Sequence, residues 1–207
     1  MEEGMETIRE QIKKKIESMQ GQASPKELRM QEEALIKILE EGKPVHEAIG
    51  VSKQSLEYMY SHAYSLYNAA KYEQAKQIFY ILNFLDEQDA RFPYGVAACY
   101  HMMKNHTNAL AMYLSCLMRE PDNPILFWHI ADCYSQMGKK VTALITLRMC
   151  VRQASKDPSF EPLKIRAERE FLVLEREVEE EVRKGQKESQ QKESQDNKNE
   201  PAVKPKG

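Results

Sequence analysis

The small and apolar residues of this chain recur with a period of 34 residues in three consecutive segments, 56–89, 90–123 and 124–157. Small residues recur at the eighth and twentieth places of each segment, and bulky apolar residues recur at the twenty-fourth. A unit of this length, with small residues where two helices touch, is typical of the helix–turn–helix tetratricopeptide repeat. The period therefore predicts an all-α solenoid of three repeats. It is defined by Ala63, Ala97, Ala131, Ala75, Ala109, Ala143, Phe79, Tyr113 and Leu147.

Further helices are predicted before the repeats. An apolar stripe within residues 5–19 is typical of an amphipathic helix, and a glycine follows it. Residues 24–27 then read Ser-Pro-Lys-Glu, a capping box with proline at the first helical position, where its missing N–H costs nothing. We therefore divide this region into an N-terminal amphipathic extension, 1–23, and an N-terminal helical region, 24–55.

A charged helix with one apolar stripe is predicted after the repeats. The last repeat of a solenoid leaves an apolar face open, and a helix with a single stripe is suited to cover it. Beyond Gly185 the chain consists mainly of Lys, Glu, Gln, Ser and Asn, which bury too little apolar surface to offset the entropy lost on ordering. We therefore predict a capping helix over 158–184 and a disordered tail over 185–207. The stripe comprises Leu163, Ala167, Phe171, Leu174, Val178 and Val182.

Composition and charge narrow the class of protein. The chain has 207 residues, of which 42% are hydrophobic, and a formal net charge of −2, so no global field favours nucleic acid or an anionic membrane. No segment approaches the roughly 18 uninterrupted apolar residues of a membrane span. The acidic start, with no apolar stretch after it, is unlike a secretory signal. We therefore expect a cytoplasmic protein that binds no nucleic acid and does not insert into membranes.

The four cysteines are spaced 17 residues apart, which is half the repeat period. They fall at the tenth and twenty-seventh places, and free cysteine often serves as a small buried hydrophobe. Packing is favoured over a metal or redox site, and the histidines form no ligand motif. The chain also lacks a nucleophile–base motif and a glycine-rich phosphate loop. We therefore expect no metal, no cofactor and no catalysis. The cysteines are Cys99, Cys116, Cys133 and Cys150.

Function is expected on residues that the repeat framework does not need. The first helix of each repeat lines the concave face of such a solenoid, and its fifth place is aromatic in all three repeats. Tyrosine and tryptophan combine a large apolar face with a polar tip, which suits a surface that receives a ligand. A peptide groove is favoured over an aromatic core, and cover by the N-terminal helices is the main alternative. The groove-facing candidates are Tyr60, Tyr64, Tyr67, Tyr94, Ala98, His101 and Trp128.

The residues at two groove-facing places of the first repeat narrow the class of ligand. Repeats that hold the C-terminal carboxylate of a peptide use Lys and Asn at the fifth and ninth places, where the first repeat has Tyr60 and Tyr64. We therefore expect no carboxylate clamp. An aromatic, mixed-polar groove favours an internal, extended segment that carries proline and aliphatic side chains. Such a stiff segment loses little entropy when it binds.

Three stretches carry a more specific pattern than the repeat itself. They are Leu56-Glu57-x-x-Tyr60-Ser61-x-Ala63-Tyr64-x-x-Tyr67 with Lys71-Tyr72-Glu73-x-Ala75, then Asp89-Ala90-Arg91-Phe92 with Gly95 and Ala98-Cys99, then Pro124, Phe127, His129, Ala131, Cys133 and Gly138. With these residues the chain, from about residue 49 to 154, resembles the class II chaperones of type III secretion systems. Residues 1–23 and the chain from about residue 162 extend beyond the usual core of that family.

The resemblance implies a bacterial cytosolic chaperone that keeps hydrophobic translocator proteins soluble and competent for export. It implies a Pro-x-Leu-x-x-Pro-like segment bound in the concave groove, where Phe92 and Tyr94 would lie beside the three tyrosines of the first repeat. It also implies a homodimer formed through the helix over 25–41. A generic tetratricopeptide-repeat adaptor for protein assembly is the alternative function. The predicted dimerisation residues are Leu28, Leu35, Ile38 and Leu39.

Overall fold

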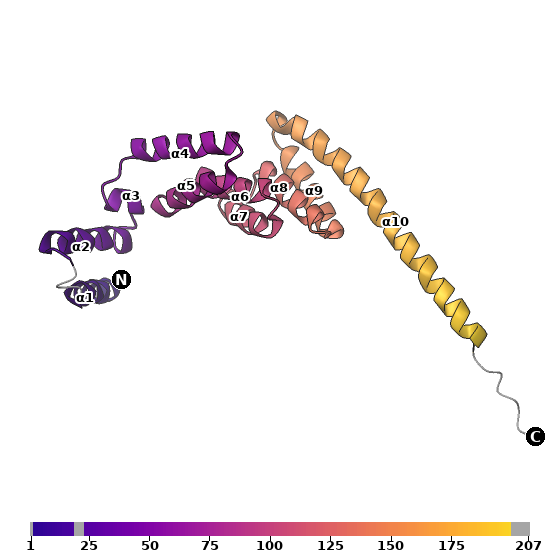
Figure 1. Cartoon of the computed structure of the whole chain (residues 1–207), viewed down its shortest axis with the longest axis horizontal. Helices are drawn as coiled ribbons and strands as arrows, with labels where there is room; N and C mark the ends of the chain where they lie inside the picture. The colour runs from indigo at the N-terminus through magenta and orange to yellow at the C-terminus, as the bar shows by residue number, and fades with distance from the viewer. Residues whose placement is uncertain (1, 19–22, 200–207) are drawn as a thin grey trace, which may run out of the picture. The chain divides into compact units, whose positions relative to one another are not determined.

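The computed structural model describes the backbone of residues 2–18 and 23–199, and the side chains of 9–18 and 23–187. In the described residues, ten α-helices and one short 3-10 helix form the secondary structure (Figure 1). The chain divides into two compact units, Met1–Arg119 and Glu120–Gly207. The all-α fold predicted from the repeat period is confirmed.

Three helix pairs follow the 34-residue period. All nine residues that define the period are buried, each with at most 3% of its surface exposed. Small side chains at the eighth and twentieth places let the two helices of a pair approach closely, while the ring or leucine at the twenty-fourth fills the core. The pairs are α4 (Lys53–Asn68) with α5 (Tyr72–Leu85), α6 (Arg91–Met102) with α7 (His106–Arg119), and α8 (Pro124–Gln136) with α9 (Lys140–Ala154).

The turn inside each pair repeats the same backbone conformation. Ala70, Lys104 and Gly138 all occupy the fifteenth place, and their φ angles are 58°, 58° and 74°. Positive φ favours glycine, because a Cβ atom in this region meets the neighbouring backbone. Only the third repeat has a glycine there, so the first two turns adopt this conformation with an ordinary side chain. The period is thus visible in the backbone as well as in the core.

Gly95 allows α6 to pack closely on α5. A Cβ atom built at this position would lie 2.6 Å from the ring of Phe79, closer than real Cβ contacts. Phe79 is itself 3% exposed and belongs to the core cluster of the first unit. The glycine therefore leaves room for this ring between the two helices.

The N-terminal helices form a small cluster of their own. α1 (Glu2–Ser18) packs on α2 (Pro25–Leu39), and α3 (Val45–Ala48) follows. Ile12, Ile16 and Leu28 form a buried core. The predicted capping box is confirmed, because the Ser24 hydroxyl accepts from the Glu27 amide at 3.3 Å and the Glu27 carboxylate accepts from the Ser24 amide at 2.8 Å.

This cluster includes two residues of the predicted dimerisation surface. Leu28 is only 8% exposed and packs on α1 of the same chain, and Leu35 packs against the same core. Ile38 is half-buried, whereas Leu39 is 54% exposed. The amphipathic extension thus supplies an intrachain partner for the apolar face of α2, and Leu28 and Leu35 are occupied within the chain.

An ion pair also joins α1 to Glu40, the residue that follows α2. Arg9 of α1 donates from Nε and Nη2 to the Glu40 carboxylate, both at 2.7 Å at their shortest. These hydrogen bonds lower the pKa of Glu40 from its ordinary value. A guanidinium that donates two parallel bonds to one carboxylate fixes orientation as well as distance. The ion pair therefore sets how α1 lies on α2.

The C-terminal helix covers the last repeat and extends further than predicted. After η1 (Pro158–Phe160), α10 (Glu161–Asn199) packs on α9, with Ala167 and Leu174 buried between the two helices. The predicted disordered tail from residue 185 is wrong as far as Asn199, while residues 200–207 lie outside the described residues. Glu, Lys and Gln are strong helix formers, so their propensity extends the helix where burial no longer supports it.

Lys140 of α9 forms two ion pairs with α10, which hold this part of α10 on the third repeat. Its ammonium group lies 2.9 Å from the Glu177 carboxylate and 2.7 Å from that of Glu181. Val182, the last residue of the predicted stripe, is 53% exposed. Among the residues described, no helix has both the length and the hydropathy needed to cross a membrane.

Candidate functional site

Three tyrosines of α4 lie on one side of the helix, because Tyr60, Tyr64 and Tyr67 are spaced at about one turn. Tyr64 is 53% exposed, while Tyr60 and Tyr67 are half-buried. The rings of Tyr60 and Tyr64 are stacked, with centroids 6.4 Å apart and planes at 17°. We call these three residues the aromatic face. It combines an open apolar surface with hydroxyl groups at its edge.

Two rings of the core contact the ring of Tyr60. The Phe79 ring meets it edge-on at 5.9 Å, and the Phe92 ring lies at 6.0 Å. Phe92 is only 1% exposed and belongs to the core cluster of the first unit. In this structure the Phe92 ring packs against Tyr60 and is buried, and its predicted contact with a peptide stays a prediction.

Arg91, the first residue of α6, lies over the same tyrosine. Its guanidinium carbon is 4.7 Å from the centroid of the Tyr60 ring. The guanidinium donates to Asp89 at 2.6 Å and to Glu57 at 2.5 Å. These bonds, first those to Asp89, raise the pKa of Arg91 above its ordinary value. Burial acts to raise the pKa of Asp89, but the hydrogen bonds from Arg91 outweigh it and the net change is downward.

The second repeat supplies a more buried set of aromatic residues. The Tyr94 ring packs edge-on against Tyr113 at 5.7 Å, and burial raises the pKa of Tyr94 to about 12. The Tyr67 ring meets Tyr72 edge-on at 5.4 Å, and burial also raises the pKa of Tyr67. After burial, the nearby Tyr67 is a further cause of the raised pKa of Tyr94.

The remaining candidates of α6 are accessible in part. Ala98 and His101 are half-buried, and Nδ1 of His101 lies 3.5 Å from the Tyr113 hydroxyl. Met102, at the end of the helix, is 49% exposed. A small alanine and an imidazole beside the tyrosines leave a surface that is apolar with scattered polar groups. The mixed-polar lining of a groove stays a prediction for these residues.

Trp128 belongs to the second compact unit, where its neighbours come from α10. The guanidinium carbon of Arg166 lies 4.7 Å from the centroid of the Trp128 ring. Trp128 also borders a small hollow with Asp132 of α8 and with Glu170 and Leu174 of α10. Trp128, at the fifth place of the third repeat, is therefore half-buried, with residues of α10 beside its ring.

The N-terminal helices make their main contacts with each other. The main contact of α1 is with α2, and α2 also contacts α3. Figure 1 shows the same pairing of α1 and α2. Cover of the aromatic face by these helices stays the alternative to a peptide ligand.

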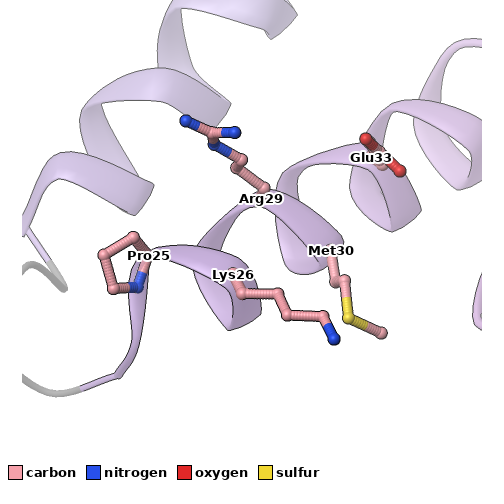
Figure 2. Close-up of a pocket in the computed structure, with 5 residues that line it drawn as sticks. All are labelled: Pro25, Lys26, Arg29, Met30 and Glu33. Carbon is pink, nitrogen blue, oxygen red and sulfur yellow. The ribbon is translucent and has the colours of Figure 1, made fainter.

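A further hollow lies on the outer side of α2. It is lined by Pro25, Lys26, Arg29, Met30 and Glu33, and Figure 2 shows Lys26 and Met30 extending from the same side of the helix. Met30 is 58% exposed. This surface is separate from the one that α1 covers.

The four cysteines lie in the core, as the half-period spacing predicts. All four are buried, and none of them forms a disulfide bond. Burial raises the pKa of Cys99 and Cys150 to about 11 and that of Cys133 to about 12. A thiol with a raised pKa is a poor nucleophile at neutral pH. Packing therefore accounts for these residues.

Sequence reasoning missed the role of Arg91 with Glu57 and Asp89. Glu57 and Arg91 both occupy the second place of their repeats, one period apart, and they meet across α4 and α6. Opposite charges at one place of consecutive repeats were the available signal. It was weak, because nothing in the sequence shows that the guanidinium also reaches Tyr60.

Comparison with known proteins agrees with the repeat architecture. The tetratricopeptide repeat family model matches residues 56–89 and 92–122. The low calcium response locus protein H of Yersinia pseudotuberculosis is 31% identical over 133 residues, covering 63% of this chain and 79% of that protein. The similarity thus extends over most of the relative's length.

Solved structures are similar in fold over a comparable region. A type III secretion complex from Aeromonas hydrophila matches with a TM-score of 0.66 and 27% identity, covering 70% of this chain and 97% of that one. The chaperone SycD of Yersinia enterocolitica, in complex with a peptide of the translocator YopD, matches with a TM-score of 0.59 and 28% identity, covering 62% and 98%. SycD has also been crystallised as an alternative dimer.

Proposed function

Because this chain belongs to the class II chaperones of type III secretion systems, we propose that it binds an extended segment of a hydrophobic translocator protein and keeps that protein soluble in the bacterial cytoplasm until export. The segment binds along the aromatic face of α4 and the adjoining residues of α6. The similar chaperone SycD has a peptide of the translocator YopD as its ligand, which supports this class of partner.

The observation that carries the proposal is the stacked pair of Tyr60 and Tyr64, of which Tyr60 is half-buried and Tyr64 is exposed. Their rings form a flat apolar surface that is supported by core residues and is open at Tyr64, which is 53% exposed. Proline and leucine side chains in an extended segment can pack on such rings. The tyrosine hydroxyl groups remain free to hydrogen-bond the backbone of the segment. We therefore propose a Pro-x-Leu-x-x-Pro-like motif as the ligand.

The proposed mechanism is equilibrium binding, without catalysis. A translocator has apolar segments that aggregate or insert prematurely when they are free in solution. A chaperone that binds one of its segments lowers the free population able to do so, in proportion to its concentration relative to Kd. The exposed tyrosine surface is occupied in the complex, so client and chaperone both bury apolar area.

The proposal is tested by titrating the full chain with a fluorescent Pro-x-Leu-x-x-Pro peptide. We expect saturable binding, and Tyr64→Ala should raise Kd by about tenfold or more, which corresponds to about 1.4 kcal/mol or more for an anchor residue. The matched control is Tyr58→Ala, because Tyr58 lies on the same helix and is 69% exposed but is not part of the aromatic face. Both variants should retain the melting temperature of the parent.

Two results would count against the aromatic face as the binding surface. One is equal loss of affinity in Tyr58→Ala and Tyr64→Ala, which would indicate a general effect on the helix. The other is unfolding of Tyr64→Ala, which would show that this tyrosine belongs to the core. An absence of peptide binding by the folded parent chain would contradict the proposed ligand.

The generic adaptor is distinguished from the chaperone by the state of its partner. A chaperone client should accumulate in the insoluble fraction when expressed alone and in the soluble fraction when expressed together with this chain. An adaptor's partner stays soluble in both cases. The experiment uses a translocator from the same secretion system, with the Tyr64→Ala chain as control.

We also propose a homodimer, formed by the outer side of α2 shown in Figure 2. This side carries exposed Met30, with Lys26 and Glu33 about one turn away on either side. In an antiparallel pair of α2 helices, these opposite charges face each other across the two-fold axis. Met30→Glu should therefore give a monomer by light scattering, whereas Met118→Glu, at an 86% exposed residue of α7, should not. A dimer that persists in Met30→Glu would contradict the assignment.

A further inference from the structure

We propose that Arg91 is a positioning residue for the aromatic face: its guanidinium, held by Glu57 and Asp89, fixes the ring of Tyr60 in the orientation that receives the peptide. The effect on peptide binding rests on the proposed function of this face. The effect on the ring itself does not, since it concerns the free protein.

Arg91 connects two helices at the point where the tyrosine is placed. Glu57 is three residues before Tyr60 on α4, and Asp89 precedes α6, so the guanidinium joins both elements. Asp89 also accepts from the Arg91 amide at 3.0 Å, which fixes the start of the helix that carries the arginine. The backbone and the side chain of Arg91 are thus held by the same carboxylate.

All three nitrogens of the guanidinium donate hydrogen bonds in the free protein. Nε donates to Asp89 at 3.0 Å, Nη2 donates to both carboxylates, and Nη1 donates to Glu57 at 3.3 Å. The guanidinium carbon lies over the Tyr60 ring, 4.7 Å from its centroid. A side chain whose nitrogens donate to two carboxylates and which lies over the ring is placed to act on the peptide through Tyr60 rather than by a direct bond.

The contacts of Tyr60 leave few other orientations for its ring. Arg91 lies over it, Phe79 and Phe92 meet it from the core, and Tyr64 is stacked beside it. Removal of the cation opens the solvent side, where no other described ring contact restrains it. A ligand that requires one orientation then binds to a smaller fraction of the population, and its apparent Kd rises in proportion.

Lysine cannot reproduce this arrangement. A guanidinium is planar and binds two carboxylates through its edge while its face stacks on an aromatic ring. An ammonium group is a compact point charge with no face to stack. Arg91→Lys is therefore the informative variant, because it retains the positive charge between Glu57 and Asp89. Arg91→Ala removes the charge as well.

The first experiment measures peptide affinity in a double-mutant cycle. We expect Arg91→Ala to raise Kd by about five- to tenfold and Arg91→Lys by about threefold or more, within the range of contact residues. In a Tyr60→Ala chain, the same Arg91 substitutions should change Kd by less than about twofold, because coupled residues are not additive. Equal losses with and without the Tyr60 ring would overturn the inference and indicate direct contact with the peptide.

The matched control is Lys76→Ala. The Lys76 ammonium group lies 4.8 Å from the centroid of the Tyr100 ring in the same unit, so it is a cation on a tyrosine that is not part of the aromatic face. We expect this substitution to change Kd by less than about twofold, as for other residues outside the centre of an interface. A comparable loss in both variants would overturn the specific role of Arg91.

The second experiment observes Tyr60 without any peptide. In protein labelled with 3-fluorotyrosine, the ¹⁹F signal of Tyr60 is the one that disappears in Tyr60→Phe. We expect that signal to shift or broaden in Arg91→Lys and to stay in place in Lys76→Ala. An unchanged signal would overturn the inference even if affinity falls. If the parent chain binds no peptide, the proposed ligand fails while this measurement still decides whether Arg91 positions the ring.

Discussion

In the first and third repeats, an arginine lies over the aromatic ring at the fifth place. In the first, the guanidinium of Arg91 lies 4.7 Å from the Tyr60 ring centroid, and in the third, the guanidinium of Arg166 lies 4.7 Å from that of Trp128. Each arginine comes from the helix that follows the repeat, α6 in one case and α10 in the other. α10 therefore supplies to the third repeat a contact of the kind that a further repeat would supply.

The difference lies in what holds the arginine and what surrounds the ring. Arg91 is bound by two carboxylates, whereas no carboxylate lies within ion-pair distance of Arg166 among the described side chains. Tyr60 is followed by a tyrosine that is 53% exposed, while Trp128 borders a hollow that α10 partly lines. Both rings are half-buried, but the first repeat places an exposed tyrosine beside its ring, whereas the third repeat places residues of the C-terminal helix beside its ring.

The largest expected effect concerns the cover that α10 gives to the third repeat. Leu174 is 6% exposed, so Leu174→Ala should lower the free energy of unfolding of the second unit by about 2–5 kcal/mol, as for other buried leucines. Urea unfolding followed by the fluorescence of Trp128, the chain's single tryptophan, measures it. Leu172→Ala, at a residue 51% exposed on the same helix, should stay within about 0.5 kcal/mol. Equal losses would show that α10 is not packed by this stripe.

A smaller effect is expected from two helical glycines, one in each unit. Gly95→Ala should cost about 1–3 kcal/mol of stability, since its Cβ atom would lie 2.6 Å from the Phe79 ring. Gly185→Ala in α10, with no atom within 4 Å of its Cβ position, should gain about 0.5–1 kcal/mol through helix propensity. Thermal unfolding measured by circular dichroism compares the two. A neutral Gly95→Ala would contradict the close approach of α5 and α6.

The fifth place of the second repeat provides a pH-dependent test. Burial raises the pKa of Tyr94 to about 12 from an ordinary value of 10.0. Because the folded-state pKa is the higher one, the contribution to stability is fully present below pH 10 and is lost as the pH rises towards 12. Ultraviolet absorbance of tyrosinate should show a group that titrates near this upper value and is absent in Tyr94→Phe. A Tyr94 that titrates with the exposed tyrosines would contradict its burial.

The smallest expected change in stability is that caused by removing Arg166, which lies over the Trp128 ring. Arg166→Ala should lower the stability of the second unit by about 0.5–1 kcal/mol, the range for an exposed cation on an aromatic ring. The emission of Trp128 should move to longer wavelength, because its ring becomes more hydrated. Peptide affinity should stay unchanged, in contrast to Arg91→Ala. A loss of affinity in Arg166→Ala would show that the third repeat also takes part in binding.

The core of the repeats was predictable because its residues are tied to the period. Small residues at the eighth and twentieth places can serve only where helices touch, and the buried Ala63, Ala75 and Ala109 confirm it. The burial of Phe92 was not predicted, because its sequence position beside groove residues does not reveal that its ring is directed into the core. Leu28 was assigned to a partner chain because an apolar helix face does not state which surface covers it.

The sequence by itself determined the all-α repeat architecture, the aromatic residues of the first repeat and the class of protein. These depend on local periodicity and on residue types, both of which can be read from the amino-acid sequence. Only the tertiary structure decided that α1 covers α2, that α10 continues to Asn199, and that Arg91 joins Glu57 and Asp89 over Tyr60. Such contacts join residues separated by a helix or a whole repeat, and their partners follow from packing geometry rather than from spacing along the chain.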